Sequence, residues 1–279
     1  MEKDRTLYIS DLDGTLLNSS AELSEYAVNT LNRLIKNGLQ FSVATARTLA
    51  TAEKILAGVG LRNPIALMNG VLIYDMGLKC FSQVLAICPD SVEAVIRVVK
   101  SFENTAFMYE LDKGEMMTYH ETLELEQHRD FVEERVARYY KSFRHTESLS
   151  GVSPEHIVYF TLLDTFDRLR PIRDALSSLT DLSLAFYMDV YHPELWYLEI
   201  FSAEASKKNA VMYLRESLEF GHIVGFGDNF NDLPMFEACD ECVAVENAKQ
   251  EVKSAADHVC ASNVDDGVVK WIEERISAP

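Results

Sequence analysis

Two aspartates near the N-terminus, Asp11 and Asp13, stand two residues apart at the end of an apolar run, YISDLDGTL. In an extended chain, residues at this spacing project from the same face, with Cα atoms roughly 6–7 Å apart. At an effective dielectric constant of about 20, two carboxylates at this separation repel each other by about 2–3 kcal/mol. A bound cation, a shared proton or full exposure to water must therefore offset the repulsion.

Further polar residues follow other predicted strands. Thr45 ends one buried strand and Asp228 ends another, and Asp232 follows Asp228 by about one helical turn. Because ligands bind beyond the carboxyl ends of parallel strands, we expect these side chains to gather with Asp11 and Asp13 at one rim. Carboxylate oxygens without cysteine or histidine favour Mg²⁺ over zinc.

Two lysines, Lys207 and Lys208, open a predicted helix whose N-cap is Ser206. At the positive end of the helix macrodipole each cation costs about 0.3–1 kcal/mol, and a bound anion would reverse that penalty. On this segment alone, two solvated lysines are the simpler interpretation. The acidic rim is what favours an anion site here.

The segments that must position these residues alternate between strand-like and helix-like at both ends of the chain. The first third predicts strands over 6–11 and 39–45, a helix between Ser24 and Gly38, and a helix over 50–60. The last third predicts the same alternation, with strands over 222–228, 242–247 and 258–261 and helices over 208–218, 231–238, 249–256 and 265–276. Continuous apolar strands between helices predict an α/β fold, a Rossmann-like parallel sheet with helices on both faces.

The middle of the chain has a different pattern. Helix-like stretches over 90–103, 121–141 and 165–178 lie between strands with clearer alternation, which predicts an inserted α+β domain with an antiparallel sheet. We therefore predict a core domain over 1–83 and 196–279 and an inserted domain over 84–195. Several aromatic and imidazole residues of this region could line a pocket, although sheet packing is the commoner role: Tyr109, Tyr119, Tyr159, Tyr187, Tyr191, His192 and Trp196.

Composition excludes several classes of protein. The 279 residues are 48% hydrophobic and 25% charged, which is typical of a globular chain with a core. A net charge of -18 without a basic patch argues against nucleic-acid and anionic-membrane surfaces. The N-terminus lacks a secretory apolar segment and no run is long enough to span a membrane, so we expect a cytoplasmic protein. Cys239 and Cys242 form a C-x-x-C, but the absence of a second pair argues against a metal site there. No protein partner is evident from the sequence.

Four motifs occur in an order that resembles the haloacid dehalogenase superfamily of phosphohydrolases: DLDGTL, VATAR, a lysine opening a late helix, and GDNFND. With LMNGVLIYD, LEIF and an insertion between the second and third motifs, they resemble its Cof-like sugar-phosphate phosphatase branch. The resemblance spans the whole chain in order, although the middle matches only in position and α+β pattern. The family usually has glycine where Ala46 and Lys208 stand, and counting from Glu199 selects Lys207 as the motif lysine.

The resemblance implies a Mg²⁺-dependent phosphomonoester hydrolase that acts on small phosphorylated metabolites, such as sugar phosphates or phosphorylated cofactors. Asp11 would attack phosphorus to form an aspartyl-phosphate, and Asp13 would be the general acid and then the base. Thr45 and Lys207 would complete the catalytic set by neutralising or binding the phosphoryl oxygens. The inserted domain would be a cap that closes over the substrate.

The resemblance also implies two sets of binding residues. The metal would be held by Asp11, the backbone carbonyl of Asp13, and Asp228, with Asp232 in support directly or through water. The phosphate-binding residues would be Leu12, Thr45, Ala46, Arg47, Lys207 and Asn231. Arg47 and the Asn69-Gly70 pair each have an equally good interpretation as surface or turn residues.

Three alternatives remain open at this point. A phosphomutase on the same scaffold would need cap cations for a second phosphate, and six are available: Lys113, Arg129, Arg135, Arg138, Lys141 and Arg144. A dehalogenase is disfavoured, because dehalogenases of this superfamily lack the acid at the position of Asp13. A catalytically idle phosphate-binding regulator is disfavoured by the intact motif acids and lysine.

Overall fold

The structure is a computed structural model that describes residues 5–189 and 192–277. The chain divides into two compact units, Met1–Gln83 with Ser206–Pro279, and Val84–Ala205. The return to the first unit therefore comes at residue 206 and not at the predicted residue 196. Within the described residues, no helix is both long enough and apolar enough to cross a membrane.

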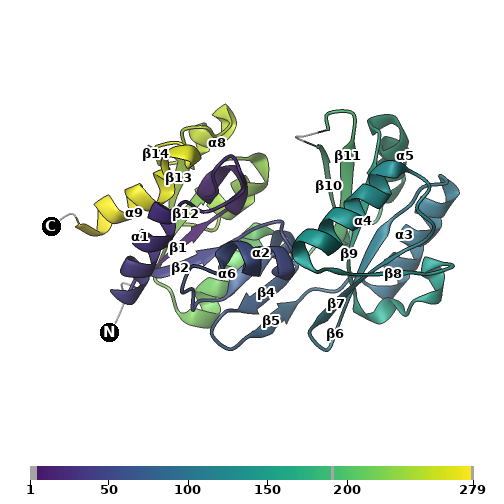
Figure 1. Cartoon of the computed structure of the whole chain (residues 1–279), viewed down its shortest axis with the longest axis horizontal. Helices are drawn as coiled ribbons and strands as arrows, with labels where there is room; N and C mark the ends of the chain where they lie inside the picture. The colour runs from purple at the N-terminus through teal and green to yellow at the C-terminus, as the bar shows by residue number, and fades with distance from the viewer. Residues whose placement is uncertain (1–4, 190–191, 278–279) are drawn as a thin grey trace. The chain divides into compact units, whose positions relative to one another are not determined.

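The first unit contains a parallel sheet in which β1 lies between β12 and β2 (Figure 1). In sheet order its strands are β14 (His258–Cys260), β13 (Glu241–Val245), β12 (His222–Gly227), β1 (Thr6–Ser10) and β2 (Gln40–Val43). Its helices are α1 (Glu25–Lys36), α2 (Leu49–Leu56), α6 (Lys207–Leu218), α7 (Leu233–Phe236), α8 (Gln250–Ala255) and α9 (Gly267–Ser277). The two ends of the chain thus share one parallel sheet, which confirms the predicted fold class.

Two helices of this unit begin at serine caps that the sequence predicts. The Ser24 hydroxyl accepts a hydrogen bond from the Ala27 amide at 2.9 Å, and α1 follows. The Ser206 hydroxyl accepts one from the Asn209 amide at 3.0 Å, and α6 follows with Lys207 as its first residue. Each cap satisfies an amide that the first helical turn leaves without an intrahelical partner.

A small antiparallel sheet also contributes to this unit, formed by β3 (Ile65–Leu67), β4 (Leu72–Asp75) and β5 (Cys80–Val84). The predicted turn at Asn69-Gly70 connects β3 to β4, and Gly70 has a φ of 92°. A Cβ on Gly70 would lie 2.3 Å from the Ser206 carbonyl oxygen. Only glycine therefore lets this turn pack against the beginning of α6.

The second unit is built on a six-stranded sheet. In sheet order its strands are β10 (Leu182–Met188), β11 (Trp196–Ser202), β9 (Ile157–Asp164), β6 (Phe107–Asp112), β7 (Glu115–His120) and β8 (Ser142–His145). Because β11 pairs with β10 on one side and β9 on the other, residues 196–205 belong to this unit. The predicted antiparallel pairing needs one correction: β7 and β8 are parallel, since α4 (Glu126–Tyr139) crosses over between them.

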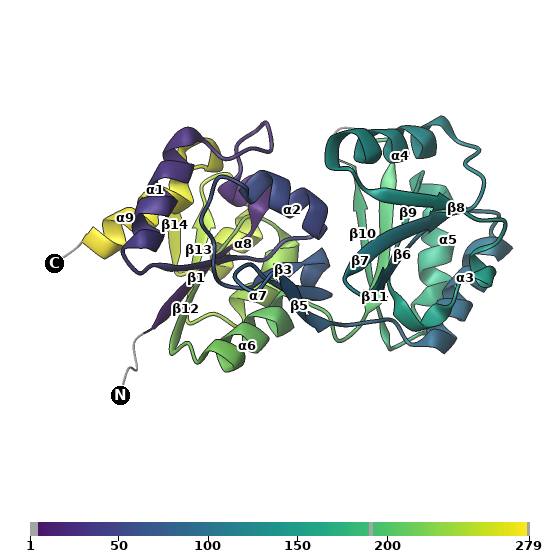
Figure 2. The same ribbon diagram turned by 60° about the horizontal axis from the view of Figure 1, so that its bottom comes forward.

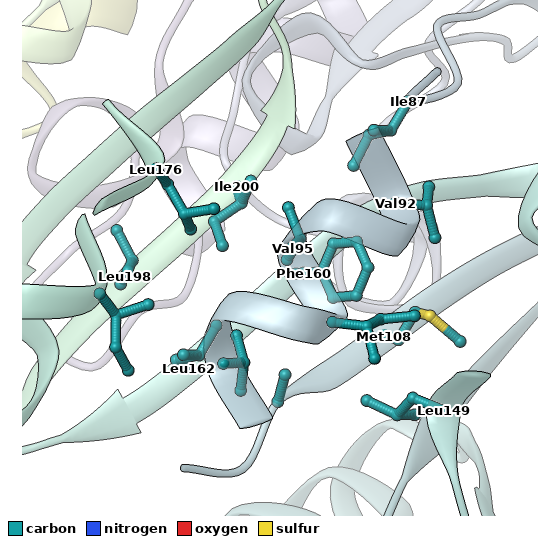
Figure 3. Close-up of a cluster of buried hydrophobic side chains, with 14 of the residues drawn as sticks. Ile87, Val92, Val95, Met108, Leu149, Phe160, Leu162, Leu176, Leu198 and Ile200 are labelled. Carbon is teal, nitrogen blue, oxygen red and sulfur yellow. The ribbon is translucent and has the colours of Figure 1, made fainter. Parts of the chain in front are cut away.

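Helices cover the two faces of this sheet unequally (Figure 2). α3 (Pro89–Ser101) and α5 (Phe166–Leu176) lie along one face, where they pack on strand residues such as Phe160 and Leu198 (Figure 3). On the opposite face α4 contributes Phe131, whose ring stacks on Phe107 at 4.5 Å. The main core of this unit therefore lies on the α3 and α5 side.

Candidate active site

Three strands of the first unit end in residues that the sequence selects. Asp11 directly follows β1, and its amide donates to the Phe226 carbonyl at 3.0 Å. Asp228 directly follows β12, the neighbour of β1 on that side. Thr45 lies just after β2, on the other side of β1. The parallel register therefore brings the three strand ends to the same edge.

A buried lysine joins two of the acids. The Lys207 Nζ atom donates to Asp11 Oδ1 and to Asp232 Oδ1, both at 2.6 Å, and only 1% of the Lys207 side chain is exposed. Lys208 instead lies at the surface, with its Nζ atom 2.8 Å from a Glu237 oxygen. The structure therefore places Lys207, the first residue of α6, among the acids.

Asp232 is fully buried and both of its oxygens have partners. Oδ1 binds Lys207, while Oδ2 accepts from the amides of Asp228 at 2.9 Å and Asn229 at 3.0 Å. A Cβ on Gly227 would lie 2.5 Å from the Asp232 Cβ atom, so this close approach requires glycine. Asp232 thus holds the loop that carries Asp228 and positions the lysine.

The carboxylates of this cluster are close enough together to hold a cation. Oxygens of Asp11, Asp228 and Asp232 lie within 4.8 Å of one another. Among the described residues, the hydrogen bonds of Asp11 and Asp228 engage Oδ1 in both cases, from Lys207 and from the Thr15 hydroxyl at 2.9 Å. The Oδ2 atoms of Asp11 and Asp228 are thus left for a ligand. This set of hard oxygens fits a divalent cation such as Mg²⁺.

The electrostatics of the cluster also favour a cation. Burial raises the pKa of Asp11 well above its ordinary value, since the attraction of Lys207 is opposed by the charges of Asp232 and Asp228. Burial and the Asp232 charge raise the pKa of Asp228 to about 6. Burial tends to lower the pKa of Lys207, but the charges of Asp11 and Asp232 outweigh it and raise that pKa. The acids therefore carry more negative charge than one lysine offsets.

Asp13 lies outside this cluster. Its carboxylate accepts two hydrogen bonds from Arg47, at 2.7 Å from Nε and 2.5 Å from a terminal nitrogen, and 52% of its side chain is exposed. Gly14 turns the chain next to it with a φ of 78°, and a Cβ there would lie 2.6 Å from Asp228 Oδ2. Asp13 is therefore a solvent-accessible acid on the loop that Asp11 begins.

The other predicted residues lie around the cluster without entering its ion pairs. Leu12 and Thr45 are buried, and the Thr45 hydroxyl accepts from the Arg47 amide at 3.2 Å. Ala46 and Asn231 are exposed. These positions leave exposed groups of two loops available to a ligand, while Thr45 fixes the loop of Arg47.

Two asparagines near the site were not selected from the sequence. Asn247 Nδ2 donates to the Gly14 carbonyl and Asn263 Nδ2 to the Leu17 carbonyl, both at 2.7 Å. The Asn263 amide also donates to Asn247 Oδ1 at 3.0 Å, so the two residues form one bracket around the loop after Asp11. Asn247 closely follows β13, so the strand-end rule that selected Asp228 could have selected it as well.

Comparisons with known proteins agree with this fold. The family model for haloacid dehalogenase-like hydrolases matches residues 8–272. The chain therefore belongs to this family, and the predicted Cof-like branch and the prediction of a hydrolase are confirmed. Among solved structures, a haloacid dehalogenase-like hydrolase from Bacteroides thetaiotaomicron aligns with a TM-score of 0.80 at 22% identity, covering 98% of this chain and all of that one.

Two curated relatives match over nearly their whole length. The 5-amino-6-(5-phospho-D-ribitylamino)uracil phosphatase YwtE of Bacillus subtilis is 26% identical, covering 96% of each chain. The pyridoxal phosphate phosphatase YbhA of Escherichia coli is 24% identical, covering 95% of this chain and 97% of the relative. These relatives differ in substrate from each other, so they do not by themselves select one for this chain.

Proposed function

We propose that this protein is a Mg²⁺-dependent phosphomonoester hydrolase acting on small phosphorylated metabolites. The observation that carries the proposal is the buried Asp11–Lys207–Asp232 ion triad with Asp228 beside it, on a chain of the haloacid dehalogenase-like family. The names of two relatives, which act on phosphorylated metabolites, support the substrate class. We also propose that the protein is cytoplasmic, that it binds no nucleic acid, and that residues 84–205 act as a cap.

The proposed reaction has two steps. A carboxylate oxygen of Asp11 attacks phosphorus, the bond from phosphorus to the leaving oxygen breaks, and Asp13 gives that oxygen its proton. Water then attacks phosphorus, Asp13 takes the water's proton, and the bond from phosphorus to Asp11 breaks to release phosphate. Lys207 binds Asp11 Oδ1 and so restricts rotation of the carboxylate that attacks.

Several groups stabilise the negative charge of the phosphoryl group. In the site of Asp11 and Asp228, a bound Mg²⁺ supplies positive charge that stabilises the phosphoryl oxygens in the transition state. The Arg47 guanidinium lies on the same rim as Asp13 and can bind phosphoryl oxygens. Thr45, Ala46 and Asn231 are proposed as further phosphate contacts.

The phosphomutase alternative is less well supported by the described residues. Most of the cap cations that could hold a second phosphate have partners in their own unit: Lys113 beside Asp112, Arg129 on the Leu123 and Glu124 carbonyls, Arg138 beside Glu134, and Arg144 over the Tyr119 ring. Arg135 lies against Glu134 as well, so this acid is close to two of the six cations. A phosphoryl group that returns to the substrate would have to compete with these partners for the cations.

The test is phosphate release from a panel of phosphorylated metabolites, with Mg²⁺ and with EDTA, by wild type, Asp11→Asn and a control. Asp90→Asn is the control, because Asp90 is an exposed aspartate in the first turn of α3. We expect release by wild type and Asp90→Asn only with Mg²⁺, and none by Asp11→Asn. Release that persists in Asp11→Asn or in EDTA would contradict the mechanism, and absence of release from every substrate would favour the mutase or the binding regulator.

A further inference from the structure

Three adjacent strands of the parallel sheet begin with a residue that can bind a metal ion (Figure 1). His222 is the first residue of β12, Glu241 of β13 and His258 of β14. Glu241 pairs with the residue two positions after His222, and His258 pairs with the residue two positions after Glu241. Alternate residues of a strand share a face, as do paired residues of neighbouring strands. The three side chains therefore project from one face, at the edge of the sheet opposite to the strand-end acids.

Glu241 is buried and only partly satisfied. Its Oε2 atom accepts a hydrogen bond from the Arg275 guanidinium at 2.8 Å. Its Oε1 atom is closed off from solvent and has no hydrogen-bond partner among residues 5–189 and 192–277. A buried carboxylate oxygen without a partner is costly, which indicates that a group from outside the described chain completes it.

The two histidines lie on either side of this carboxylate. The His258 Nε2 atom is 2.9 Å from Oε1 of Glu241, and the His222 Nε2 atom is 3.6 Å from Oε2. Neither contact is a hydrogen bond, since Oε1 has no such partner within the described residues and the second separation is too long. Neighbouring ligand atoms of a tetrahedral Zn²⁺ ion lie roughly 3.3–3.6 Å apart. The two contacts thus have separations close to those of ligands that share one ion.

His222 also faces a second acid. Its Nδ1 atom lies 3.9 Å from Asp240 Oδ2, and Arg215 holds this oxygen at 2.7 Å. An imidazole that binds a metal commonly donates its other N–H to a carboxylate, which orients the ring. Across the described residues, the three ligand atoms of this cluster do not yet all lie within 4.8 Å of one another. Binding therefore needs a rotation of the His222 side chain, which is 41% exposed and free to turn towards Glu241.

We propose that His222, Glu241 and His258 bind one divalent transition-metal ion such as Zn²⁺. Imidazole nitrogens with a carboxylate suit zinc, whereas the all-carboxylate set at the strand ends suits Mg²⁺. The ion is bound by Oε1 of Glu241, while Arg275 keeps Oε2, and water completes the coordination. It links the starts of three strands, so it stabilises the fold and takes no part in the proposed reaction.

The experiment is calorimetric titration of Zn²⁺ into the full chain, with excess Mg²⁺ present for the strand-end acids. For wild type we expect saturable binding at a single site. His258→Gln and Glu241→Gln each remove a ligand and should weaken binding about 100-fold or more, since loss of an outer partner alone costs about 10- to 100-fold. His156→Gln is the control and should bind as wild type, because His156 is a half-exposed imidazole 3.9 Å from an Asp112 oxygen in the second unit.

Urea denaturation gives a second readout. Zn²⁺ that binds only the folded chain should raise the urea midpoint of wild type and His156→Gln, but not that of His258→Gln. The His258 side chain is 46% exposed, so its replacement should leave the fold intact, which circular dichroism checks. Equal Zn²⁺ affinity in wild type and His258→Gln would overturn the proposal. The same loss in His156→Gln, or heats that never saturate and so report adventitious binding only, would overturn it as well.

Discussion

At the scale of single residues, the centre of the site is a lysine that is buried among acids. Lys207 contacts Asp11 and Asp232, and both oxygens of Asp232 are already used. Such a group cannot be removed without leaving uncompensated charge in the interior. Lys208, the next residue, has no such neighbours in the cluster and pairs with Glu237 at the surface.

Replacing Lys207 should therefore affect stability and activity together. For Lys207→Met we expect loss of phosphate release and a decrease of about 3 kcal/mol in the free energy of unfolding, measured by urea denaturation. For Lys208→Met we expect a change within about 0.5 kcal/mol and near-normal activity. Equal effects of the two substitutions would contradict the role of Lys207 in neutralising Asp11 and Asp232.

The raised pKa of Asp228 makes the metal-free protein sensitive to pH. The pKa of Asp228 in the folded protein, about 6, lies above the ordinary value of 3.8. The contribution of Asp228 to the stability of the fold is therefore fully present below pH 3.8 and is lost as the pH rises through 6. In EDTA, Asp228→Asn should be more stable than wild type at pH 7.5, by up to about 3 kcal/mol, with the difference shrinking towards pH 4. Urea midpoints at several pH values measure this, and a difference that grows on acidification would contradict it.

At the scale of elements, the loop after Asp11 depends on residues far along the chain. Asn247 and Asn263 bind its Gly14 and Leu17 carbonyls, and Thr15 binds Asp228. Strand ends bring the acids together, while these contacts fix the path of the chain between Asp11 and α1. We expect the position of Asp13 to depend on this bracket.

Asn247→Ala should lower kcat about 10- to 100-fold, with a smaller effect on KM, because a small displacement of a proton donor is costly for the chemical step. The free energy of unfolding should fall by only about 1 kcal/mol. Asn32→Ala is the control, since Asn32 brackets a remote loop in the same way through Gly58 and Gly60, both at 2.8 Å. If both variants lose kcat equally, the bracket has no specific role in catalysis.

The sequence predicts the strand-end acids well and the contacts between loops poorly. Asp11 and Asp228 follow from a local rule, because the end of a parallel strand determines where the side chain lies. The local pattern at the start of the helix does not separate Lys207 from Lys208, and Lys207 is selected through the family resemblance. The Arg47 pairing with Asp13 and the Asn247 bond to Gly14 depend on loop conformations set by distant residues. No short-range pattern specifies such contacts.

At the scale of the whole molecule, the second unit is continuous in sequence, whereas the first is assembled from two segments. The structure divides the chain after residue 205, whereas the predicted boundary is at 195, and the mixed burial of β11 does not by itself assign this strand to either unit. Only strand pairing assigns it, with β10 and β9 on its two sides. The unit also has a core of its own beneath α3 and α5.

Residues 84–205 should consequently fold when expressed alone, with a cooperative urea transition followed by circular dichroism. A fragment ending at residue 195 is the matched control, because it lacks β11 from the middle of the sheet. We expect that fragment to show no cooperative transition. Equal folding of both fragments would mean that β11 is not needed to complete the unit.

The central claim is that Asp11 becomes phosphorylated, and the most direct measurement is mass spectrometry of acid-quenched enzyme during turnover of p-nitrophenyl phosphate. This leaving group needs little protonation, so Asp13→Asn should form the aspartyl-phosphate and hydrolyse it slowly. We predict one added phosphoryl group on the peptide containing Asp11 in Asp13→Asn, and none in Asp11→Asn. Turnover by wild type without a phosphorylated Asp11 peptide in Asp13→Asn would contradict the account and indicate direct attack by water.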